Sequence, residues 1–303
     1  MTFSLVTFRS PVSGPKVGLL LPGGSVIEPA GLRHWPSMLD LLEDWPTATS
    51  LLDSLDPAEL AHLTPVAGAE LLAPIRFPRK VMCAGVNYRK HVAEMGGSVP
   101  DGDWRPYFFL KPPSTTVTGP GDPIVIRDTD NARYDWEIEL AVIIGRAGRD
   151  IPPAQASQHI AGYCVANDIT ARGYHRRRSA PSEPFAYDWF AAKGIDSSLP
   201  LGPGITPAKF ITDPQNLHLR LWHNGELQQD ETTADMICQV DELVAAASKV
   251  VTLEPGDVIA TGTPSGVGAA RGIALKHNDI VTAAIEGLGQ ISNRVIDAER
   301  SEP

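Results

Sequence analysis

Residues 134–144 read YDWEIELAVII, and this stretch decides the fold. Side chains on a β-strand alternate between its two faces, so Glu137 and Glu139 share one face while Ile138 and Leu140 enter the opposite core. Asp135 shares the acidic face. The apolar run that follows the acids predicts a strand over residues 136–145 in a β-rich protein.

The acids on this strand have two interpretations. In one, they lie on the wet face of a half-exposed strand. In the other, they are partly buried, repel one another and need a cation to compensate their charge. Asp168 favours the second, because it ends another apolar strand and would complete a site of three carboxylates with room for water or substrate. Oxygen ligands with no Cys or His nearby favour Mg²⁺, Mn²⁺ or Ca²⁺ over zinc.

The rest of the sequence predicts a mixed α/β, β-rich fold. Period-two patterns predict further strands over residues 80–85, 123–126, 162–167, 217–223, 257–260 and 280–285. The pair Asn224-Gly225 between strand-like flanks predicts a hairpin. Helices are expected over residues 153–160 and 241–251, the second capped by Asp241.

The first seventy residues differ from the rest in their pattern of strand and helix signals. Short strand patterns over residues 3–8 and 17–21 precede brief helical patterns that begin at Ser37 and at Asp56-Pro57. The segment 72–78 is rich in turn signals and separates this part from the next strand. We therefore expect a small N-terminal α+β domain over residues 1–74 and a catalytic domain over residues 75–303, which suits a chain of 303 residues.

Composition and charge exclude several partners. The formal net charge is −10, so no basic face large enough for nucleic acid is implied. The arginines at 176–178 are interpreted as solvated surface. The absence of a signal peptide and of an apolar run near the ~20 residues that span a bilayer argues against a membrane protein. Three separated cysteines in apolar surroundings indicate reduced core thiols, and we expect a cytoplasmic protein.

An acid–base pair is the second chemical signal. His91 and Glu94 stand three residues apart, which places them side by side on a helical turn. A carboxylate beside an imidazole fixes its tautomer and raises its basicity, as a general base requires. The alternative is an ordinary surface pair. The glycine-rich segment around Thr263 offers backbone amides and hydroxyls suited to a carboxylate, but it lacks the lysine of a phosphate-binding loop.

Six ordered motifs resemble the fumarylacetoacetate hydrolase family over roughly residues 75–296. They read AGVNYRKHVAEMG (84–96), PYFFLKPPSTTVTGPGDPI (106–124), YDWEIELAVIIG (134–145), IAGYCVANDITAR (160–172), AAKGIDSSLPLGP (191–203) and LEPGDVIATGTPSGVG (253–268). The resemblance implies a β-roll-like catalytic body, usually a homodimer. It also implies Mg²⁺ or Mn²⁺ held by the positions matching Glu137, Glu139 and Asp168, with Asp135 as a supporting or surface acid.

The resemblance also assigns roles around the metal. His91, oriented by Glu94, would act as the base, and Lys193 would stabilise developing negative charge. Arg172, His175 and Thr263 would contact the carboxylate of a 2-oxo acid substrate. His175 stands where the family often has a glutamine, and residues 176–189 form a longer loop than in short members. The segment 98–105 is expected at the rim of a lid.

These residues lead to one hypothesis and two rivals. The leading hypothesis is a metal-dependent hydrolase that cleaves a C–C bond in acylpyruvate-like or fumarylpyruvate-like 2-oxo acids, because the His91–Glu94 pair can activate water. The first rival is an oxaloacetate-type decarboxylase or a hydroxydienoate isomerase on the same metal. The second is a catalytically silent metal or 2-oxo acid binding protein, against which the complete set of candidate residues argues.

Overall fold

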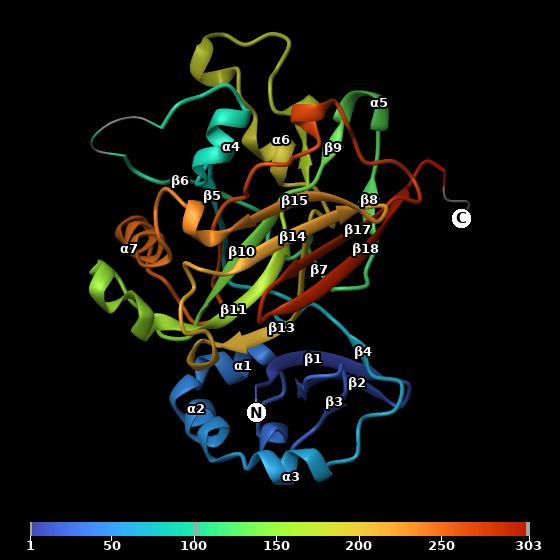
Figure 1. Ribbon diagram of the computed structural model, residues 1–303, viewed down its shortest axis with the longest axis vertical. Helices are drawn as coiled ribbons and strands as arrows, with labels where there is room; N and C mark the ends of the chain where they lie inside the picture. The colour runs from blue at the N-terminus through green and yellow to red at the C-terminus, as the bar shows by residue number, and fades with distance from the viewer. Residues whose placement is uncertain (1, 100–101, 103, 301–303) are drawn as a thin grey trace.

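The computed structural model describes residues 2–99, 102 and 104–300. Its largest sheet has 11 strands and runs through the whole molecule (Figure 1). Nine of them follow one another in the order β3 (Val26–Ile27), β2 (Ser13–Leu20), β1 (Ser4–Ser10), β13 (Leu199–Pro207), β11 (Ile160–Asn167), β10 (Ile138–Ile144), β16 (Val258–Ala260), β5 (Val81–Gly85) and β6 (Tyr107–Leu110). The short strands β4 (Glu70–Leu71) and β7 (Val117–Thr118) pair with β1 and β13.

Two smaller sheets complete the part of the chain after residue 74. One has five strands in the order β15 (Glu226–Thr232), β14 (His218–His223), β17 (Ile280–Ile285), β18 (Gly289–Asp297) and β8 (Ile124–Ile126). The other pairs β9 (Tyr134–Asp135) with β12 (Thr170–Ala171). The mixed α/β, sheet-rich architecture expected from the sequence is confirmed.

The helices are short and lie around the sheets (Figure 1). The α-helices are α1 (Met38–Glu43), α2 (Trp45–Ser54), α3 (Pro57–His62), α4 (Arg89–Glu94), α5 (Thr129–Ala132), α6 (Trp189–Lys193) and α7 (Val240–Val250). Short 3-10 helices cover Ala30–His34, Pro153–His159, Arg172–Tyr174, Glu183–Phe185, Ala208–Phe210, Thr233–Asp235 and Ala269–Arg271. Ser37 and Asp56 cap α1 and α3 as the sequence predicts.

Strand β10 is buried on both faces, which explains why all its residues except Glu139 are apolar. Ile138, Leu140 and Val142 pack into a core shared with the five-stranded sheet. Ala141 and Ile143 point to the other face, into a core shared with the N-terminal segment. Because both faces of a central strand are covered, every residue of β10 is buried.

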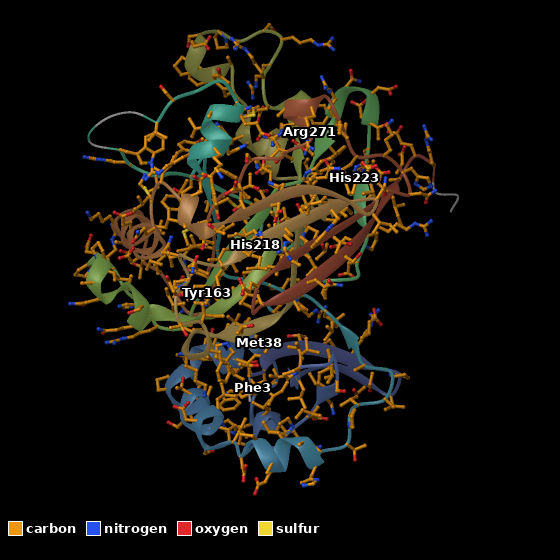
Figure 2. All side chains as sticks on the ribbon, viewed as in Figure 1. Phe3, Met38, Tyr163, His218, His223 and Arg271 are labelled. Carbon is orange, nitrogen blue, oxygen red and sulfur yellow. The ribbon has the colours of Figure 1, made fainter. Side chains whose placement is uncertain are left out.

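The N-terminal segment shares both a sheet and a core with the rest of the chain. Strand β1 pairs antiparallel with β13, with Leu5 opposite Ile205. Phe3 and Met38, labelled in Figure 2, belong to the same buried cluster as Val258 of strand β16. The expected division at residues 74 and 75 stays a prediction.

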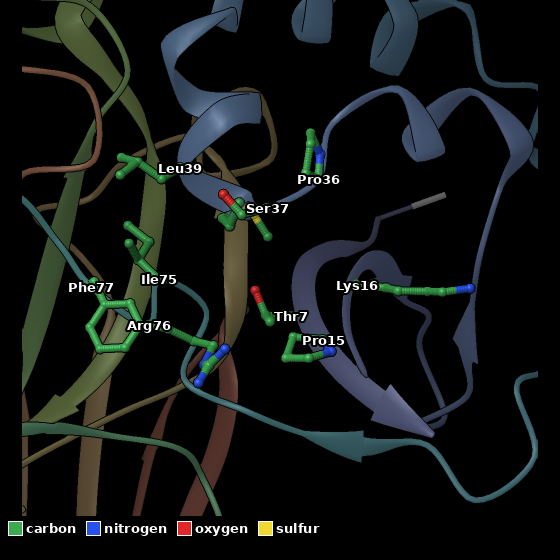
Figure 3. Close-up of a pocket in the computed structure, with 10 residues that line it drawn as sticks. Thr7, Pro15, Lys16, Pro36, Ser37, Leu39, Ile75, Arg76 and Phe77 are labelled. Atoms are coloured by element: carbon green, nitrogen blue, oxygen red, sulfur yellow. The ribbon is translucent and has the colours of Figure 1, made fainter. Parts of the chain in front are cut away.

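A cavity of about 300 Å³ lies where the two parts meet (Figure 3). Thr7, Lys16 and Ser37 line it from the N-terminal side, and Ile75 and Phe77 line it from the connecting segment. Its lining shares no residue with the cavity at the acidic strand described below.

The expected strand over residues 136–145 is confirmed as β10, which begins two residues later and ends one residue earlier. Two expectations about helices were wrong. The expected helix over residues 153–160 is a 3-10 helix over Pro153–His159. Helix α7 begins one residue early and is capped by Gln239 in a reciprocal capping box with Glu242, so Asp241 lies inside the helix.

The hairpin at Asn224-Gly225 was predicted correctly. Strands β14 and β15 pair across it, and both turn residues have positive φ, 51° at Asn224 and 83° at Gly225. By contrast, no sequence pattern predicted β13, which contains Pro200, Pro203 and Pro207 although it lies between β11 and β1.

Candidate active site

Three carboxylates from two neighbouring strands form the centre of the site, here called the carboxylate cluster. Glu137 directly precedes β10, Glu139 is its second residue, and Asp168 directly follows β11. The register pairs Glu139 with Ala166, and Asp168 N–H donates to the Glu137 carbonyl at 2.8 Å. One oxygen of each carboxylate lies within 4.8 Å of the others.

The carboxylate cluster is buried. Glu137, Glu139 and Asp168 are 6%, 1% and 0% exposed, so these acids are not on the wet face of a strand. Their ligand atoms are hard oxygens, and the described residues add no Cys or His to the group. This donor set could hold a divalent metal ion such as Mg²⁺ or Mn²⁺.

Three cations neutralise part of this charge. Lys193 Nζ donates to Glu137 Oε2 at 2.8 Å and to Asp168 Oδ2 at 2.7 Å. Lys111 Nζ donates to Asp168 Oδ1 at 2.6 Å and to the Ile169 carbonyl at 3.2 Å. Burial would lower the pKa of the Lys193 amine, but Asp168 and Glu137 outweigh it and the pKa is raised.

Arg172 is the third cation, and Asp135 holds it in place. The guanidinium donates to Asp135 Oδ2 at 2.9 Å and to Glu137 Oε1 at 2.5 Å. Asp135 also accepts from the backbone N–H groups of Gly268 and Ala269. Asp135 is 0% exposed, so of the two roles expected for it the structure matches the supporting acid and not the surface acid. These two hydrogen bonds use two of the five guanidinium N–H donors.

The charges in this region do not cancel. Four buried carboxylates, including Asp135, face the three cations, which leaves one negative charge in excess. Burial and the neighbouring Asp168 and Glu137 raise the pKa of Glu139 well above its usual range. A raised carboxyl pKa records an unfavourable negative charge, which a divalent cation would relieve. The charge excess and the oxygen donors together fit a divalent ion.

His91 and Glu94 lie on α4, as the spacing predicts. His91 Nδ1 and Glu94 Oε2 are 3.1 Å apart, and Glu94 Oε1 accepts from Gly266 N–H at 2.9 Å. Burial would raise the pKa of Glu94, but the hydrogen bonds from His91 and Gly266 outweigh it and the pKa is lowered. An ionised Glu94 favours a proton on Nδ1 of His91 and leaves Nε2 free to accept one.

The loop after β16 fixes the carboxylates from the other side. Gly262 N–H donates to Glu139 Oε2 at 2.7 Å, and Gly262 has a φ of 93°. Thr263 Oγ1 donates to the Ile138 carbonyl at 2.8 Å and accepts from Gln229 Nε2 at 2.9 Å. Gln229 is 0% exposed and also accepts from Ile138 N–H, so it clamps this loop to the start of β10.

A small cavity of about 50 Å³ connects these groups. Its polar lining comes from His91, Glu137, Glu139, Asp168, Arg172, Lys193 and Thr263. Its apolar lining comes from Val86, Phe109, Trp189 and their neighbours, and Val86 has a φ of 53°, which is strained for a β-branched residue. The fold therefore brings seven predicted residues to one cavity.

His175 and Glu94 are not among the residues that line this cavity. Glu94 contacts His91, which lines the cavity. The His175 ring packs against Trp189 and Tyr187 instead, with ring centroids 4.4 Å and 5.4 Å apart. Burial, followed by the nearby Arg172, lowers the pKa of His175. In the segment expected at the lid rim, Asp101 and Asp103 lie outside the described residues, and Trp104 packs near Leu243.

Sequence reasoning missed three residues of the site. Lys111 is a lone lysine at the end of an aromatic strand and is 1% exposed, a pattern that could have marked it as a buried partner for an acid. Trp189 precedes Lys193 by four residues and therefore shares its helix face. Gln229 carries no signal in the sequence, because it reaches the site from the five-stranded sheet.

The sequence of this chain also matches a known protein family. Residues 80–296 match the family model for the C-terminal domain of fumarylacetoacetate hydrolase, which is well over half of the chain. The chain belongs to the fumarylacetoacetate hydrolase family. The resemblance inferred from the six motifs is thereby confirmed.

Relatives within this family are linked to different reactions. The chain is 38% identical to the mitochondrial oxaloacetate tautomerase fahd2 of Xenopus laevis, over 98% of this chain and 91% of that one. It resembles maleylpyruvate hydrolase from Sphingobium sp. SYK-6, solved with manganese and pyruvate, at 29% identity and a TM-score of 0.77 over 97% and 99% of the two chains.

A third relative is a probable 2-hydroxyhepta-2,4-diene-1,7-dioate isomerase from Mycobacterium abscessus. It is 30% identical with a TM-score of 0.79, over 100% of both chains. Relatives named as a tautomerase, a hydrolase and an isomerase thus resemble the same chain. Membership of the family therefore indicates an enzyme but does not identify its reaction. Among the described residues, no helix is long and apolar enough to cross a membrane.

Proposed function

We propose that this protein transfers a proton at the carbon next to the 2-oxo group of a small 2-oxo acid, and that its reaction is the keto–enol tautomerisation of oxaloacetate. The observation that carries the proposal is that His91 lines the same cavity as the carboxylate cluster. Full-length similarity to an oxaloacetate tautomerase supports this choice of substrate.

The proposed metal ligands are Glu137, Glu139 and Asp168, with Mg²⁺ or Mn²⁺ as the ion. When bound, the ion supplies a Lewis acid that withdraws electron density from the 2-oxo group. The manganese in the maleylpyruvate hydrolase structure supports this choice of ion.

His91 acts as the base in the proposed reaction. Its Nε2 accepts a proton from carbon 3, and the electron pair of that C–H bond becomes the C2–C3 double bond. Glu94 stabilises the imidazolium that forms, because its carboxylate lies 3.1 Å from Nδ1. The oxygen at carbon 2 takes a proton from water, and the imidazolium returns its proton to water, so the charges balance.

The cations bind the substrate. Lys193 has three N–H donors, of which two serve Glu137 and Asp168, and the third is available to the oxygen that gains negative charge. Such a fixed donor can contribute on the order of 3 kcal/mol to a transition state. Arg172 and Thr263 line the cavity and are the proposed contacts for the substrate carboxylates, Thr263 through its backbone N–H because its hydroxyl donates to the Ile138 carbonyl.

Hydrolysis of acylpyruvates or fumarylpyruvate is the second candidate. The same His91–Glu94 pair could deprotonate water for attack on the distal carbonyl, after which the C–C bond breaks and leaves pyruvate. The similarity to a maleylpyruvate hydrolase favours this candidate.

One assay separates these reactions. Protein loaded with Mg²⁺ or Mn²⁺ is mixed in D₂O with oxaloacetate, acetylpyruvate, fumarylpyruvate or a hydroxymuconate-type dienoate, and products are followed by absorbance and NMR with a chelator control. We expect faster loss of the oxaloacetate enol and faster deuterium exchange at carbon 3, with both effects lost on chelation. Pyruvate plus a second acid would establish the hydrolase instead. Carbon dioxide release or a shifted double bond would establish decarboxylation or isomerisation.

We also propose that the protein forms a homodimer. Strand β6 ends the strand order of the large sheet, and its Tyr107 and Leu110 are 46% and 62% exposed. Apolar edge strands are surfaces on which chains pair. Sedimentation that shows only monomer at micromolar concentration would refute this proposal. The cytoplasmic location and the absence of nucleic-acid and membrane partners stay predictions.

A further inference from the structure

A group of five rings in contact with one another lies beside the cavity and is here called the aromatic wall: Tyr107, Phe109, His175, Tyr187 and Trp189. Trp189 is its centre, with ring centroids 5.1 Å from Tyr107, 5.2 Å from Phe109 and 4.4 Å from His175. Phe109 and Trp189 line the cavity, whereas Tyr107 and Tyr187 are 46% and 44% exposed. The aromatic wall therefore extends from the lining of the cavity to the surface of the protein.

Helix α6 ties the aromatic wall to the carboxylate cluster. Trp189 and Lys193 are four residues apart, so they lie on the same face of the helix. Lys193 is bound to two buried carboxylates, and its Nζ lies 5.1 Å from the Phe109 ring centroid. Trp189 cannot move outward with the helix unless these buried ion pairs break.

The start of α6 is also held. Asp188 caps the helix by accepting from Ala191 N–H at 2.9 Å. The guanidinium of Arg177 donates two hydrogen bonds to Asp188, at 3.0 and 2.7 Å. Asp188 N–H in turn donates to the His175 carbonyl at 2.8 Å. Arg177, one of the three arginines at residues 176–178, therefore anchors the segment that carries His175, Tyr187 and Trp189 of the aromatic wall.

The space left inside this wall is small. The cavity measures about 50 Å³, whereas a site for one water molecule needs roughly 10–15 Å³ on the same measure. A substrate whose head group binds at the carboxylate cluster shares this cavity with the side chains of Phe109 and Trp189. We propose that Trp189 limits the length of the substrate's distal group, so that the site takes short 2-oxo acids and rejects those with long or aromatic ends. The identity of the head group rests on the proposed function.

The test measures binding rather than turnover. Manganese-loaded protein is titrated calorimetrically with pyruvate, 2-oxobutanoate, 2-oxohexanoate and phenylpyruvate. Wild type should bind the two longer acids at least about tenfold more weakly than pyruvate, since a single methylene in a pocket can change affinity 10- to 200-fold. Trp189→Ala should reduce this ratio at least about tenfold, and Trp189→Phe should give an intermediate ratio.

Phe190→Ala is the matched control. Phe190 is the next residue on the same short helix, but its ring is 70% exposed, so the variant should keep the chain-length profile of wild type. A thermal melt of each variant checks folding. If Trp189→Ala does not fold, Trp189→Phe and Phe109→Leu decide the question in its place.

The outcomes separate this inference from the proposed function. An unchanged chain-length profile in folded Trp189 variants would overturn the inference, as would wild type that binds none of the acids. Wild type that shows the profile but leaves oxaloacetate unchanged would refute the proposed reaction and support the size limit.

Discussion

The carboxylate cluster and the aromatic wall border the same cavity but are built in opposite ways. The cluster lies on central strands β10 and β11, and each of its acids is at most 6% exposed and held by cations or backbone N–H groups. The wall comes from edge strand β6, a five-residue helix and a loop, and several of its rings are partly exposed. The difference teaches that central strands can enclose charged groups completely, whereas the edge strand, short helix and loop leave part of the aromatic wall exposed to solvent.

The largest expected effect comes from removing one acid of the cluster. Glu139→Gln keeps the hydrogen bond from Gly262 but removes an anionic ligand, so Mn²⁺ affinity should fall at least about 100-fold and turnover should be lost. Titration calorimetry measures the affinity. Glu70→Gln, at an exposed pair with Arg9, is the control. Unchanged Mn²⁺ affinity in Glu139→Gln would exclude this metal site.

The next effect tests the link between the cluster and the base. His91→Ala should lower kcat by about 10²- to 10⁴-fold while Mn²⁺ binding stays near wild type. Steady-state kinetics with calorimetry measures both quantities. His218→Ala removes another histidine that faces a carboxylate, Asp230 at 2.6 Å on the surface, and should leave kcat unchanged. A His91→Ala variant that turns over at the wild-type rate would show that His91 is not the base.

Lys111→Met tests how the cluster is neutralised. The change leaves Asp168 Oδ1 without its ammonium partner, so the metal-free protein should lose about 3–5 kcal/mol of unfolding free energy. Because more negative charge then faces the ion, Mn²⁺ should raise the Tm of the variant more than that of wild type. Lys209→Met, at an exposed pair with Asp53, should cost less than about 1 kcal/mol. Equal Tm gains in Lys111→Met and wild type would contradict this account.

The smallest effect concerns pH and the aromatic wall. Burial and then Arg172 lower the pKa of His175 in the folded state, so the unfolded chain binds the proton more readily. The stability that this histidine contributes is therefore present above its unfolded pKa of about 6.5 and is lost as pH falls toward the folded value. His175→Gln should reduce the fall of Tm between pH 7 and pH 5, by up to about 2 °C. Melting curves measure it, and an unchanged pH slope would remove His175 as the cause.

The sequence predicted the carboxylate cluster well because its signals are local. Alternation places Glu137 and Glu139 together, and the end of an apolar strand marks Asp168. The spacing of His91 and Glu94 likewise predicts a contact that the structure contains. The family resemblance added Lys193, whose surroundings of small residues give no chemical hint by themselves.

Other features depended on contacts between distant segments. Lys111 reaches Asp168 across 57 positions, and Gln229 reaches Ile138 across 91, so no spacing rule could have paired them. Strand β13 forms despite its prolines because β1 and β11 flank it, and Gln239 displaces Asp241 as a cap because Glu242 completes a capping box.

The sequence by itself determined the β-rich class, the acidic centre and the acid–base pair, because alternation and helical spacing act between near neighbours. Only the tertiary structure decided that Arg172 donates hydrogen bonds to Asp135 and Glu137. The same holds for His175, which packs on Trp189 outside the lining of the cavity. The physical reason is that buried charges and rings must find partners, and those partners are supplied by whichever segments the fold brings alongside.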